Sequence, residues 1–476
     1  MAVTQLKDVI QQSGVAFGTS GARGLVSALT DEVCAAYTQA FACTMQANFR
    51  FDKVAIAVDL RPSSLRIAQA CASMLRQLGI EAVFCDAIPT PALALYAQTR
   101  QIPGIMVTGS HIPFDRNGLK FYRPDGEISK SDEAAMLDCE LTERAVDETA
   151  LSPVNPDAYQ EYMQRYIAVA GVNGLSGLKL ALYQHSSVGR DLMQALLTSL
   201  GAEVICLERS ESFVPIDTEA VSAEDVQRGL AWARQYEVDA IISTDGDGDR
   251  PLISDECGQW LRGDIVGLLT ARALKIDHLA VPVSCNTAIE NSGFFKQVIR
   301  TRIGSPFVIA GMEQLAAGGA SGVAGFEANG GFLLGSPSPQ FPALAALPTR
   351  DAVLPVVILL TQVKQLGQAL SQQVAMLPQR FTASDRLQNF ATSKSQALLA
   401  EWSVNLDVLV DALKLPFKVS QVDTTDGLRL TLTSNQIVHL RPSGNAPEFR
   451  CYVEDVSVAA AMTLLETTLT QLSKFA

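Results

Sequence analysis

The sequence is poor in the residue patterns that build metal or disulfide centres, and it has no excess of positive charge. Its nine cysteines stand singly, without a Cys-x-x-Cys pair or a cysteine–histidine cluster at zinc spacing, so structural zinc is not expected. We interpret them as reduced, mostly buried thiols of a cytosolic protein. The formal net charge of −13 argues against a general nucleic-acid binder, although a local basic pocket could still hold a phosphorylated substrate.

Long apolar runs are also lacking. The most hydrophobic segment, VLPVVILL at residues 353–360, is too short to span a bilayer and contains a proline. The first residues, MAVTQLKDVIQQSG, do not have the apolar core of a signal peptide. We therefore expect a cytoplasmic protein that does not associate with membranes.

A repeated strand–helix pattern fills most of the 476 residues, of which 48% are hydrophobic and 18% charged. KVAIAVD (53–59) reads as a strand, PSSLRIAQACASMLRQLG as a helix and EAVFCDA as the next strand. The residues expected on the buried face of that helix are Leu65, Ala68, Cys71, Leu75 and Leu78. The pieces MLRQLGIEAVF and LLTSLGAEVIC resemble each other, which indicates a unit repeated about every 100 residues.

The pattern changes after about residue 370. DGLRLTLTSNQIVHL predicts a hairpin, and VAAAMTLLETTLTQL predicts a closing helix. The predicted fold class is α/β: three related α/β units with mixed, largely parallel sheets, plus a C-terminal α+β domain, around a central cleft. The expected domains are residues 1–152, 153–257, 258–372 and 373–476.

In each of the three repeats, one unusual polar sequence follows the last strand. These sequences are TGSH, TDGDGDR and GFEANGG. Ligands of open α/β sheets bind at the carboxyl ends of the strands. Three motifs in corresponding places therefore predict that three domains contribute to one cleft.

The motif TDGDGDR (244–250) predicts a site for a divalent cation. Asp245, Asp247 and Asp249 alternate with glycines, which allow a tight loop that turns three carboxylates toward one point. Oxygen ligands favour Mg²⁺ or Ca²⁺ over zinc. An EF-hand is a poor alternative, because Arg250 stands where that loop needs glycine and a strand leads into it. A solvated acidic turn is the other alternative.

Two further loops are candidates for phosphate binding. RPSGNAPEFR (441–450) offers Arg441, Ser443, the backbone of Gly444 and Asn445, and Arg450, which together match a phosphate dianion in shape and charge. An ordinary turn with a helix N-cap is the alternative for this loop. GTSGARG (18–24), which contains Arg23, is as consistent with a flexible loop as with a phosphate contact.

The remaining two motifs carry a carboxylate and a hydroxyl. In GFEANGG (325–331), Glu327 and Asn329 suit sugar hydroxyls, but a simple bulge and turn is equally consistent. Ser110 in TGSHIP lacks the Gly-x-Ser-x-Gly context of a hydrolase. At a strand end, near Lys120 and a divalent metal, it is suited to hold and pass on a phosphoryl group. Its neighbour His111 could be a simple loop residue.

Five motifs in this order resemble the α-D-phosphohexomutase family, which comprises phosphomannomutases, phosphoglucomutases and phosphoglucosamine mutases. They are GTSGARG, TGSHIP with NGLK, DGDGDR, the glutamate loop and RPSGNAP. The resemblance covers nearly the whole chain. It implies four domains around a deep central cleft, three of them related α/β units.

The resemblance also implies roles for individual residues. Ser110 would be phosphorylated in the active enzyme, and Asp245, Asp247 and Asp249 would bind Mg²⁺ together with an oxygen of the phosphoserine. The groups implied to bind phosphate or move protons are Arg23, His111, Lys120 and Arg250. The implied sugar-binding loop holds Glu327 and Asn329, and the implied phosphate-binding loop holds Arg441, Ser443, Gly444 and Asn445.

The implied reaction interconverts hexose 1-phosphate and hexose 6-phosphate through a hexose 1,6-bisphosphate that turns around in the cleft. The pattern is most similar to phosphomannomutases, with glucose and glucosamine phosphates as alternative substrates. Departures from the usual family pattern are Ile112, Ser305 and the sequence Phe-Glu-Ala-Asn-Gly-Gly of the sugar loop. A metal-dependent sugar phosphatase and a non-catalytic phosphosugar-binding protein are the alternatives from other classes. No partner protein is indicated.

Overall fold

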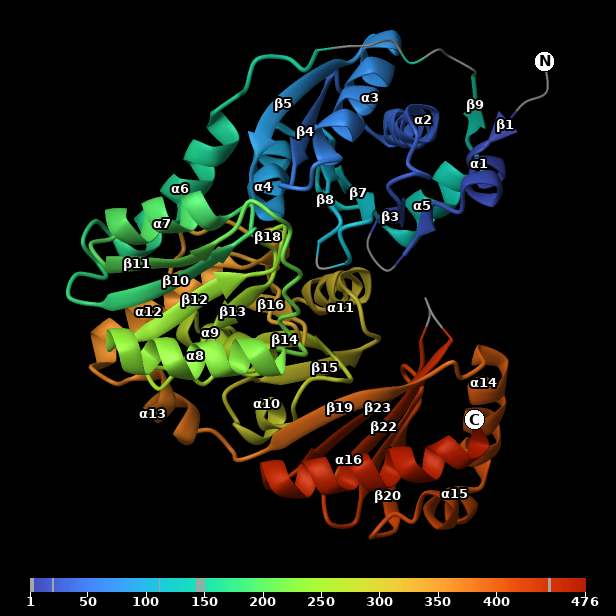
Figure 1. Ribbon diagram of the computed structural model, residues 1–476, viewed down its shortest axis with the longest axis vertical. Coiled ribbons are helices and arrows are strands. Elements are labelled where there is room, and N and C mark those ends of the chain that lie inside the picture. The colour runs from blue at the N-terminus through green and yellow to red at the C-terminus, as the bar shows by residue number, and fades with distance from the viewer. Residues whose placement is uncertain (1–3, 19–20, 111, 143–145, 147–149, 444–446) are drawn as a thin grey trace.

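The chain folds into four units that follow one another along a curved path, from unit I at the top of Figure 1 to unit IV at the bottom. The computed structural model describes residues 4–18, 21–110, 112–142, 146, 150–443 and 447–476. In this part of the chain, no helix has both the length and the apolar character needed to cross a bilayer. All nine cysteines are free thiols.

Unit I is built on a mixed sheet whose strands lie in the order β2-β3-β7-β6-β4-β5, with β8 paired to β7. Its elements are β1 (Thr4–Gln5), α1 (Leu6–Ser13), β2 (Ala16–Phe17), β3 (Ala22–Leu25), α2 (Asp31–Asn48), β4 (Lys53–Val58), α3 (Ser64–Gln77), β5 (Glu81–Ala87), α4 (Thr90–Arg100), β6 (Gly104–Val107), β7 (Arg116–Arg123), β8 (Gly126–Glu127), α5 (Lys130–Leu137) and β9 (Glu140–Leu141).

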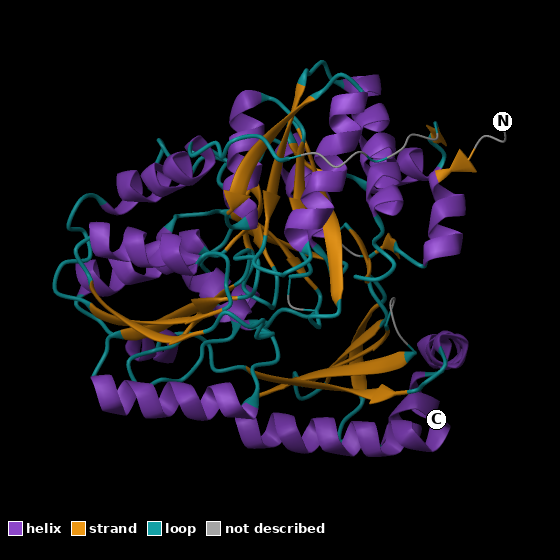
Figure 2. Ribbon diagram, turned by 45° about the horizontal axis from the view of Figure 1, so that its top comes forward, coloured by secondary structure: helices purple, strands orange, loops and turns teal. Residues whose placement is uncertain are grey.

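Units II and III have smaller mixed sheets with helices on both faces (Figure 2). Unit II contains α6 (Asp157–Ala170), β10 (Lys179–His185), α7 (Arg190–Ser199), β11 (Glu203–Arg209), α8 (Ala223–Tyr236), β12 (Ala240–Thr244) and β13 (Pro251–Ile253). Unit III contains α9 (Gly263–Ala273), β14 (His278–Pro282), α10 (Ala288–Asn291), β15 (Gln297–Thr301), α11 (Ser305–Ala317), β16 (Val323–Phe326), β17 (Phe332–Leu334), β18 (Leu347–Asp351), α12 (Val353–Leu366) and α13 (Leu370–Ala375).

The three units share one strand arrangement, which confirms the predicted repeat. The orders β5-β4-β6-β7, β11-β10-β12-β13 and β15-β14-β16-β17 are the same pattern. In each, the first three strands in sequence are parallel and the fourth returns antiparallel to the third. The hairpin loop between the third and fourth strands therefore leaves each sheet at its carboxyl edge.

Unit IV has an antiparallel sheet in the order β19-β23-β22-β21-β20. Its elements are β19 (Phe381–Gln388), α14 (Thr392–Val404), α15 (Leu406–Leu413), β20 (Val419–Asp423), β21 (Leu428–Leu432), β22 (Ile437–Pro442), β23 (Glu448–Asp455), α16 (Val458–Leu472) and η1 (Ser473–Phe475). The predicted hairpin and closing helix are both present. The predicted domain boundary after residue 372 would divide α13; the boundaries remain predictions.

Helix α3 shows how the local sequence sets the packing. Ile67, Ala68, Cys71 and Leu75 are fully buried, while Leu65 is 52% exposed. The apolar stripe thus lies slightly to one side of the predicted one, with Ile67 in the place expected for Leu65. The helix stops before Gly79, whose φ of 75° is the left-handed conformation that glycine adopts without steric cost.

Units I, II and III share a hydrophobic core, whereas unit IV has its own. One cluster of buried side chains runs from α4 through α6 to α12 and into the sheets of all three α/β units. A separate cluster fills the space between the unit IV sheet and its helices. Units III and IV meet through polar contacts. The Thr287 amide donates to Oε2 of Glu454 at 2.9 Å, and the Ile303 amide donates to Oδ2 of Asp426 at 3.0 Å. Unit IV is therefore attached to unit III by less apolar contact than joins units I, II and III to one another.

We expect His439 to make the stability of unit IV depend on pH. Its Nε2 lies 2.6 Å from the Asp426 carbonyl, and its Nδ1 has no partner in the described part of the chain. Burial lowers the pKa of His439 from 6.5 to about 4, against the opposing effect of the carbonyl. The unfolded chain then binds more protons between these two pH values. The free energy of unfolding should fall by about 3 kcal/mol as the pH drops from 7 to 4.

Urea unfolding at a series of pH values measures this dependence. His439→Gln keeps a donor for the Asp426 carbonyl and should flatten the slope between pH 6.5 and 4 relative to the parent protein. His278→Gln, at a partly exposed histidine, is the control and should leave the slope unchanged. An unchanged slope in His439→Gln would contradict the assignment.

Candidate active site

The three equivalent hairpin loops of units I, II and III converge on one place. The β6–β7 loop carries Ser110, the β12–β13 loop carries the three aspartates and the β16–β17 loop carries Glu327. The Ser110 hydroxyl donates a hydrogen bond of 2.8 Å to Oδ2 of Asp245, which belongs to the next unit. Units I and II are therefore in direct contact through the two residues that the sequence placed in one cleft.

The Ser110 loop is held in a strained shape. Ser110 is fully buried, and its φ of 51° is a left-handed conformation that costs a non-glycine residue about 1 kcal/mol or more. Its amide donates to Oγ1 of Thr108 at 2.8 Å, and its carbonyl accepts from Arg61 at 2.9 Å. These partners hold the backbone of Ser110 in place on both sides of its side chain.

Arg61 is the main support of this loop, although the sequence singled out neither it nor Asp59. Its guanidinium also donates to the carbonyls of Ile112, Pro113 and Arg116, at 2.6, 2.8 and 3.0 Å. Asp59 lies 3.3 Å from the Arg61 guanidinium and is bonded to the loop as well. The sequence DLR directly follows β4, and the other motifs also directly follow a strand. This position could have identified Asp59 and Arg61 as candidate site residues.

Gly109 shows how closely Arg61 approaches the loop backbone. A Cβ at this position would lie 2.5 Å from the guanidinium carbon of Arg61, so the guanidinium would have to move away from the loop carbonyls that it binds. Glycine is therefore required between Thr108 and Ser110. The TGS sequence thus reflects packing as well as chemistry.

Asp245, Asp247 and Asp249 form a buried cluster whose ligand atoms lie within 4.8 Å of one another. Burial, together with repulsion from Asp247 and Asp249, raises the pKa of Asp245 well above its usual value. Burial also disfavours ionised Asp247, but Lys120 outweighs it and the pKa of Asp247 falls below its usual range. The cluster therefore depends on nearby positive charge.

Lys120 provides part of that charge. Its ammonium lies 2.5 Å from Oδ2 of Asp247 and 2.6 Å from Oδ2 of Asp249. The hydroxyl of Thr90 donates to the same Oδ2 of Asp247 at 2.6 Å. Thr90 belongs to none of the motifs that the sequence analysis identified. Lys120 is carried by β7, directly after the Ser110 loop, which explains its spacing in the sequence.

The cluster fits a divalent cation. Oδ1 of Asp247 and Oδ1 of Asp249 are buried and have no hydrogen-bond partner in the described residues, whereas Oδ2 of each accepts from Lys120. Buried carboxylate oxygens without a partner are costly, and hard oxygen ligands are those that Mg²⁺ prefers. The donor set therefore suits Mg²⁺, with Asp245, Asp247 and Asp249 as its protein ligands.

Three arginines crowd around the aspartates. Burial, with repulsion from Arg250 and Arg350, lowers the pKa of Arg23 to about 10, despite attraction by Asp247 and Asp249. The Arg250 Nε lies 3.6 Å from Oδ1 of Asp249. Guanidinium groups that repel one another in a buried place favour an anion between them, and a phosphate matches their geometry.

The sugar-loop candidates are placed differently from each other. Glu327 is buried, and its Oε2 lies 3.3 Å from Arg350, which contacts Asp249 as well. The Asn329 side chain accepts from the Gly331 amide at 3.0 Å, and the Asn329 carbonyl accepts from the Thr218 hydroxyl at 2.7 Å. Asn329 therefore shapes its own loop through its amide oxygen.

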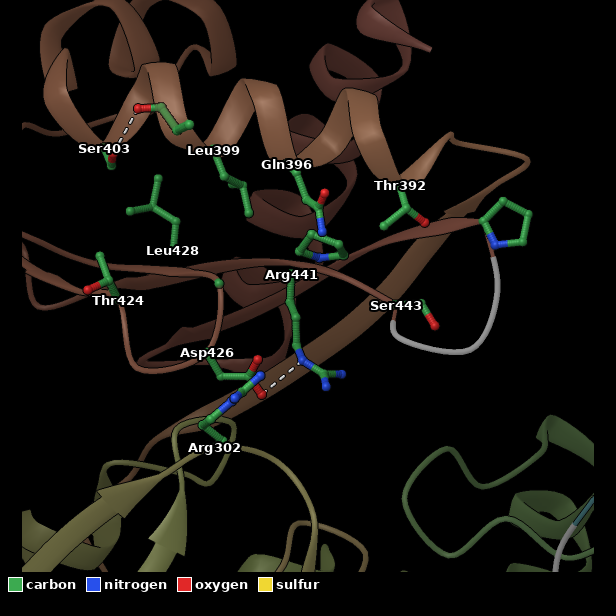
Figure 3. Close-up of a pocket in the computed structure, with 14 residues that line it drawn as sticks. Arg302, Thr392, Gln396, Leu399, Ser403, Thr424, Asp426, Leu428, Arg441 and Ser443 are labelled. Carbon is green, nitrogen blue, oxygen red and sulfur yellow. Dashed lines mark hydrogen bonds and ion pairs between the residues drawn. The ribbon is translucent and has the colours of Figure 1, made fainter. Parts of the chain in front are cut away.

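Two of the unit IV candidates line a separate cavity of about 850 Å³ between units III and IV, whereas Arg450 is not among its lining residues (Figure 3). Arg441 and Ser443 are among its lining residues, together with Arg302 from unit III. The Arg441 Nε lies 2.9 Å from Oδ2 of Asp426. Arg450 pairs with Glu448 at 3.1 Å. His111, Gly444 and Asn445 lie outside the described residues.

Ser305, one of the departures from the family pattern, is fully buried and donates to Glu127 at 2.9 Å. Its hydroxyl therefore connects unit III to unit I. This contact explains why serine is found at position 305. The structure thus brings Arg23, Ser110, Lys120, Arg250 and the three aspartates together, with Glu327 joined to them through Arg350. Arg441 and Ser443 line the cavity between units III and IV, and Arg450 lies on β23 of unit IV.

The three α/β units match known protein domains. Models of the phosphoglucomutase/phosphomannomutase alpha/beta/alpha domains I, II and III match residues 14–144, 157–258 and 262–381. A phosphomannomutase of Salmonella muenchen is 50% identical over 472 residues, covering 98% of this chain and 97% of the relative. A phosphomannomutase of Sinorhizobium fredii (strain NBRC 101917 / NGR234) is 43% identical over 462 residues, covering 95% and 97%.

The fold is also that of a solved structure. A phosphoglucomutase/phosphomannomutase family protein from Burkholderia thailandensis superposes with a TM-score of 0.74 at 20% identity, over 96% of this chain and 97% of that one. With the repeated hairpin loops, the matched domains and these relatives, the chain belongs to the phosphoglucomutase/phosphomannomutase family of phosphohexomutases.

Proposed function

We propose that the protein is a phosphomannomutase that interconverts mannose 6-phosphate and mannose 1-phosphate. The observation that carries this proposal is the 2.8 Å contact between the Ser110 hydroxyl and Asp245, made across two units beside a carboxylate cluster that fits Mg²⁺. The choice of mannose over glucose or glucosamine is supported by relatives named phosphomannomutases at 50% and 43% identity.

The proposed reaction is a double phosphoryl transfer with Ser110 as the carrier. In the first half, the bond between phosphorus and Ser110 Oγ breaks as the free hydroxyl of mannose 1-phosphate attacks, giving mannose 1,6-bisphosphate and a serine hydroxyl. In the second half, the other phosphoryl group returns to Ser110 and mannose 6-phosphate leaves. Each half replaces one P–O bond by another, so no phosphate reaches water.

The residues around Ser110 have distinct parts in this scheme. Mg²⁺ bound by Asp245, Asp247 and Asp249 would neutralise charge on the transferring phosphoryl oxygens. Arg23 and Arg250 would bind those oxygens from the other side. Lys120 keeps Oδ2 of Asp247 and Asp249 occupied, so that their Oδ1 atoms remain for the cation.

The unit IV cavity would bind the phosphate that is not reacting. Arg441 and Ser443 are the described groups suited to it, and Arg302 adds a second guanidinium from unit III. Because the bisphosphate must present each phosphate to Ser110 in turn, the same cavity would accept either end of the sugar. Glu327 and Asn329 would contact the sugar hydroxyls in both poses.

We predict that the protein gains one phosphate when it is incubated with glucose 1,6-bisphosphate, and that Ser110→Ala does not. Ser110 is the carrier, so the variant should also lose mutase activity by about a thousandfold or more. Intact-mass spectrometry measures the phosphate directly. Ser199→Ala, at the end of α7, is the control and should be phosphorylated like the parent.

A phosphate on Ser110→Ala would show that another residue is the carrier. A stable phosphoserine in the parent protein without any conversion of mannose 1-phosphate would favour the phosphosugar-binding protein over the mutase.

We predict that Asp247→Ala folds but has no Mg²⁺-dependent turnover. The substitution removes one ligand of the cation, which supplies several kcal/mol of transition-state stabilisation, so turnover should fall by about a thousandfold. Mutase assays and calorimetric titration with Mg²⁺ give the two readouts. Asp191→Ala removes a surface carboxylate that pairs with Arg209 and should change neither. Near-parental turnover in Asp247→Ala would remove the metal assignment.

We predict that mannose 1-phosphate is converted with a higher kcat/KM than glucose 1-phosphate or glucosamine 1-phosphate. Side-by-side assays with bisphosphate priming measure the three values under one set of conditions. A preference for glucose or glucosamine would make the protein a different member of the same family. Release of inorganic phosphate without any isomer would instead identify a phosphatase.

A further inference from the structure

Three consecutive polar residues at the end of β18, Thr349, Arg350 and Asp351, are all buried, at 2, 3 and 2% exposure. Each of them bonds to another unit of the molecule. We propose that this triplet, here called the coupling strand, sets the position of the sugar-binding loop against the metal-binding loop, with Arg350 as its central positioning residue. This inference rests on the proposed mutase function and concerns the same site.

Arg350 joins the two loops directly. Its guanidinium lies 2.9 Å from Oδ2 of Asp249 in unit II and 3.3 Å from Oε2 of Glu327 in unit III. A guanidinium is planar and has several fixed donors, so it can hold two carboxylates at a set separation, which a lysine cannot do. Arg350 therefore fixes the distance between Asp249 and Glu327.

The loop itself is shaped to admit Arg350. A Cβ at Gly331 would lie 2.7 Å from Cγ and Cδ of Arg350. Any other residue at this position would push the arginine away from its two carboxylates. The glycine that closes the GFEANGG motif is thus explained by Arg350 as well as by the turn.

Asp351 anchors the coupling strand to unit II. Its carboxylate accepts from the hydroxyl of Tyr162 at 2.7 Å and from that of Tyr166, both on α6. The same carboxylate accepts from the amides of Val353 and Leu354, which begin α12. All of these groups are buried, so removing any one leaves a partner unsatisfied.

Thr349 anchors the strand to unit I. Its hydroxyl donates to Oε1 of Glu127 at 2.7 Å, and Oε2 of Glu127 accepts from Ser305 of α11 at 2.9 Å. Glu127 lies on β8, which pairs with β7, the strand that carries Lys120. The coupling strand therefore contacts β8, which pairs with the strand that follows the Ser110 loop, and Asp249 of the metal-binding loop.

Charge and positioning predict opposite effects when Arg350 is removed. Its positive charge lies beside Asp249 and competes with a bound divalent cation, which can itself supply the charge that the ionised carboxylates need. The loss of Arg350 should therefore strengthen Mg²⁺ binding. Its loss also frees Glu327 from Asp249, so the sugar would be held less accurately and turnover should fall. A residue with only a general structural role would weaken both properties together.

The experiment compares Arg350→Gln and Arg350→Lys with the parent protein. Arg350→Gln should bind Mg²⁺ about tenfold more tightly in calorimetric titration, while kcat falls about a hundredfold. Arg350→Lys keeps the positive charge but loses the planar set of guanidinium donors. Its Mg²⁺ affinity should therefore stay within about twofold of the parent, while kcat falls about tenfold. Arg209→Gln, at a surface ion pair with Asp191, is the control and should behave as the parent.

Thr349→Val adds a test that leaves every charge in place. It removes the hydroxyl that bonds to Glu127 and lies 3.5 Å from the Tyr122 hydroxyl, with almost no change of volume. Mg²⁺ affinity should therefore be unchanged and kcat/KM should fall about fivefold. If Arg350→Gln does not fold, Arg350→Lys and Thr349→Val still decide between the alternatives.

Unchanged or weaker Mg²⁺ binding in folded Arg350→Gln, parental kcat in Arg350→Lys, or parental kcat/KM in Thr349→Val would each overturn the proposal. The Mg²⁺ titrations need no mutase activity. If the parent protein converts no phosphosugar, the proposed function fails, while the titrations still report whether Arg350 opposes the cation.

Discussion

The arrangement of the molecule depends on three buried carboxylates that cannot be ionised together without positive charge beside them. Asp245, Asp247 and Asp249 lie within one small volume, and the groups that stabilise them come from different parts of the chain. Lys120 comes from unit I and Arg350 from unit III. Because each cation is itself buried, neither side of these pairs is stable alone. The ion pairs of the site therefore connect the first three units.

The repeated strand order explains how so many groups reach one place. In each of the three α/β units, the loop after the third strand leaves the sheet at its carboxyl edge, and one such loop carries the serine, one the aspartates and one the glutamate. The units also share a hydrophobic core, which keeps these loops at fixed positions. Unit IV has a core of its own and meets unit III through polar contacts, so it is held to the rest of the molecule less firmly than the first three units are held to one another.

The sequence was sufficient for features that arise from local patterns. The strand–helix repeat, the hairpin of β21 and β22 and the three polar loops are all encoded in short windows, and the family resemblance was carried by motifs of the same length. Residues that act over long separations gave little signal. Arg61 and Arg350 are single arginines whose partners lie far along the chain. β19 has a polar, partly exposed sequence at the sheet edge and lacks the alternation that marks a strand. For Arg350, the only available signal was a run of three polar residues, Thr-Arg-Asp, between two apolar segments.

The central claim is that a hydroxyl on unit I passes a phosphoryl group to a sugar beside carboxylates on unit II. A single-turnover experiment with protein carrying a labelled phosphate on Ser110 tests it most directly. With Mg²⁺ present, the label should move to mannose 1-phosphate and appear as mannose 1,6-bisphosphate, and removal of Mg²⁺ should stop the transfer. Label that leaves only as inorganic phosphate, or that moves to the sugar equally well without a divalent cation, would contradict the account.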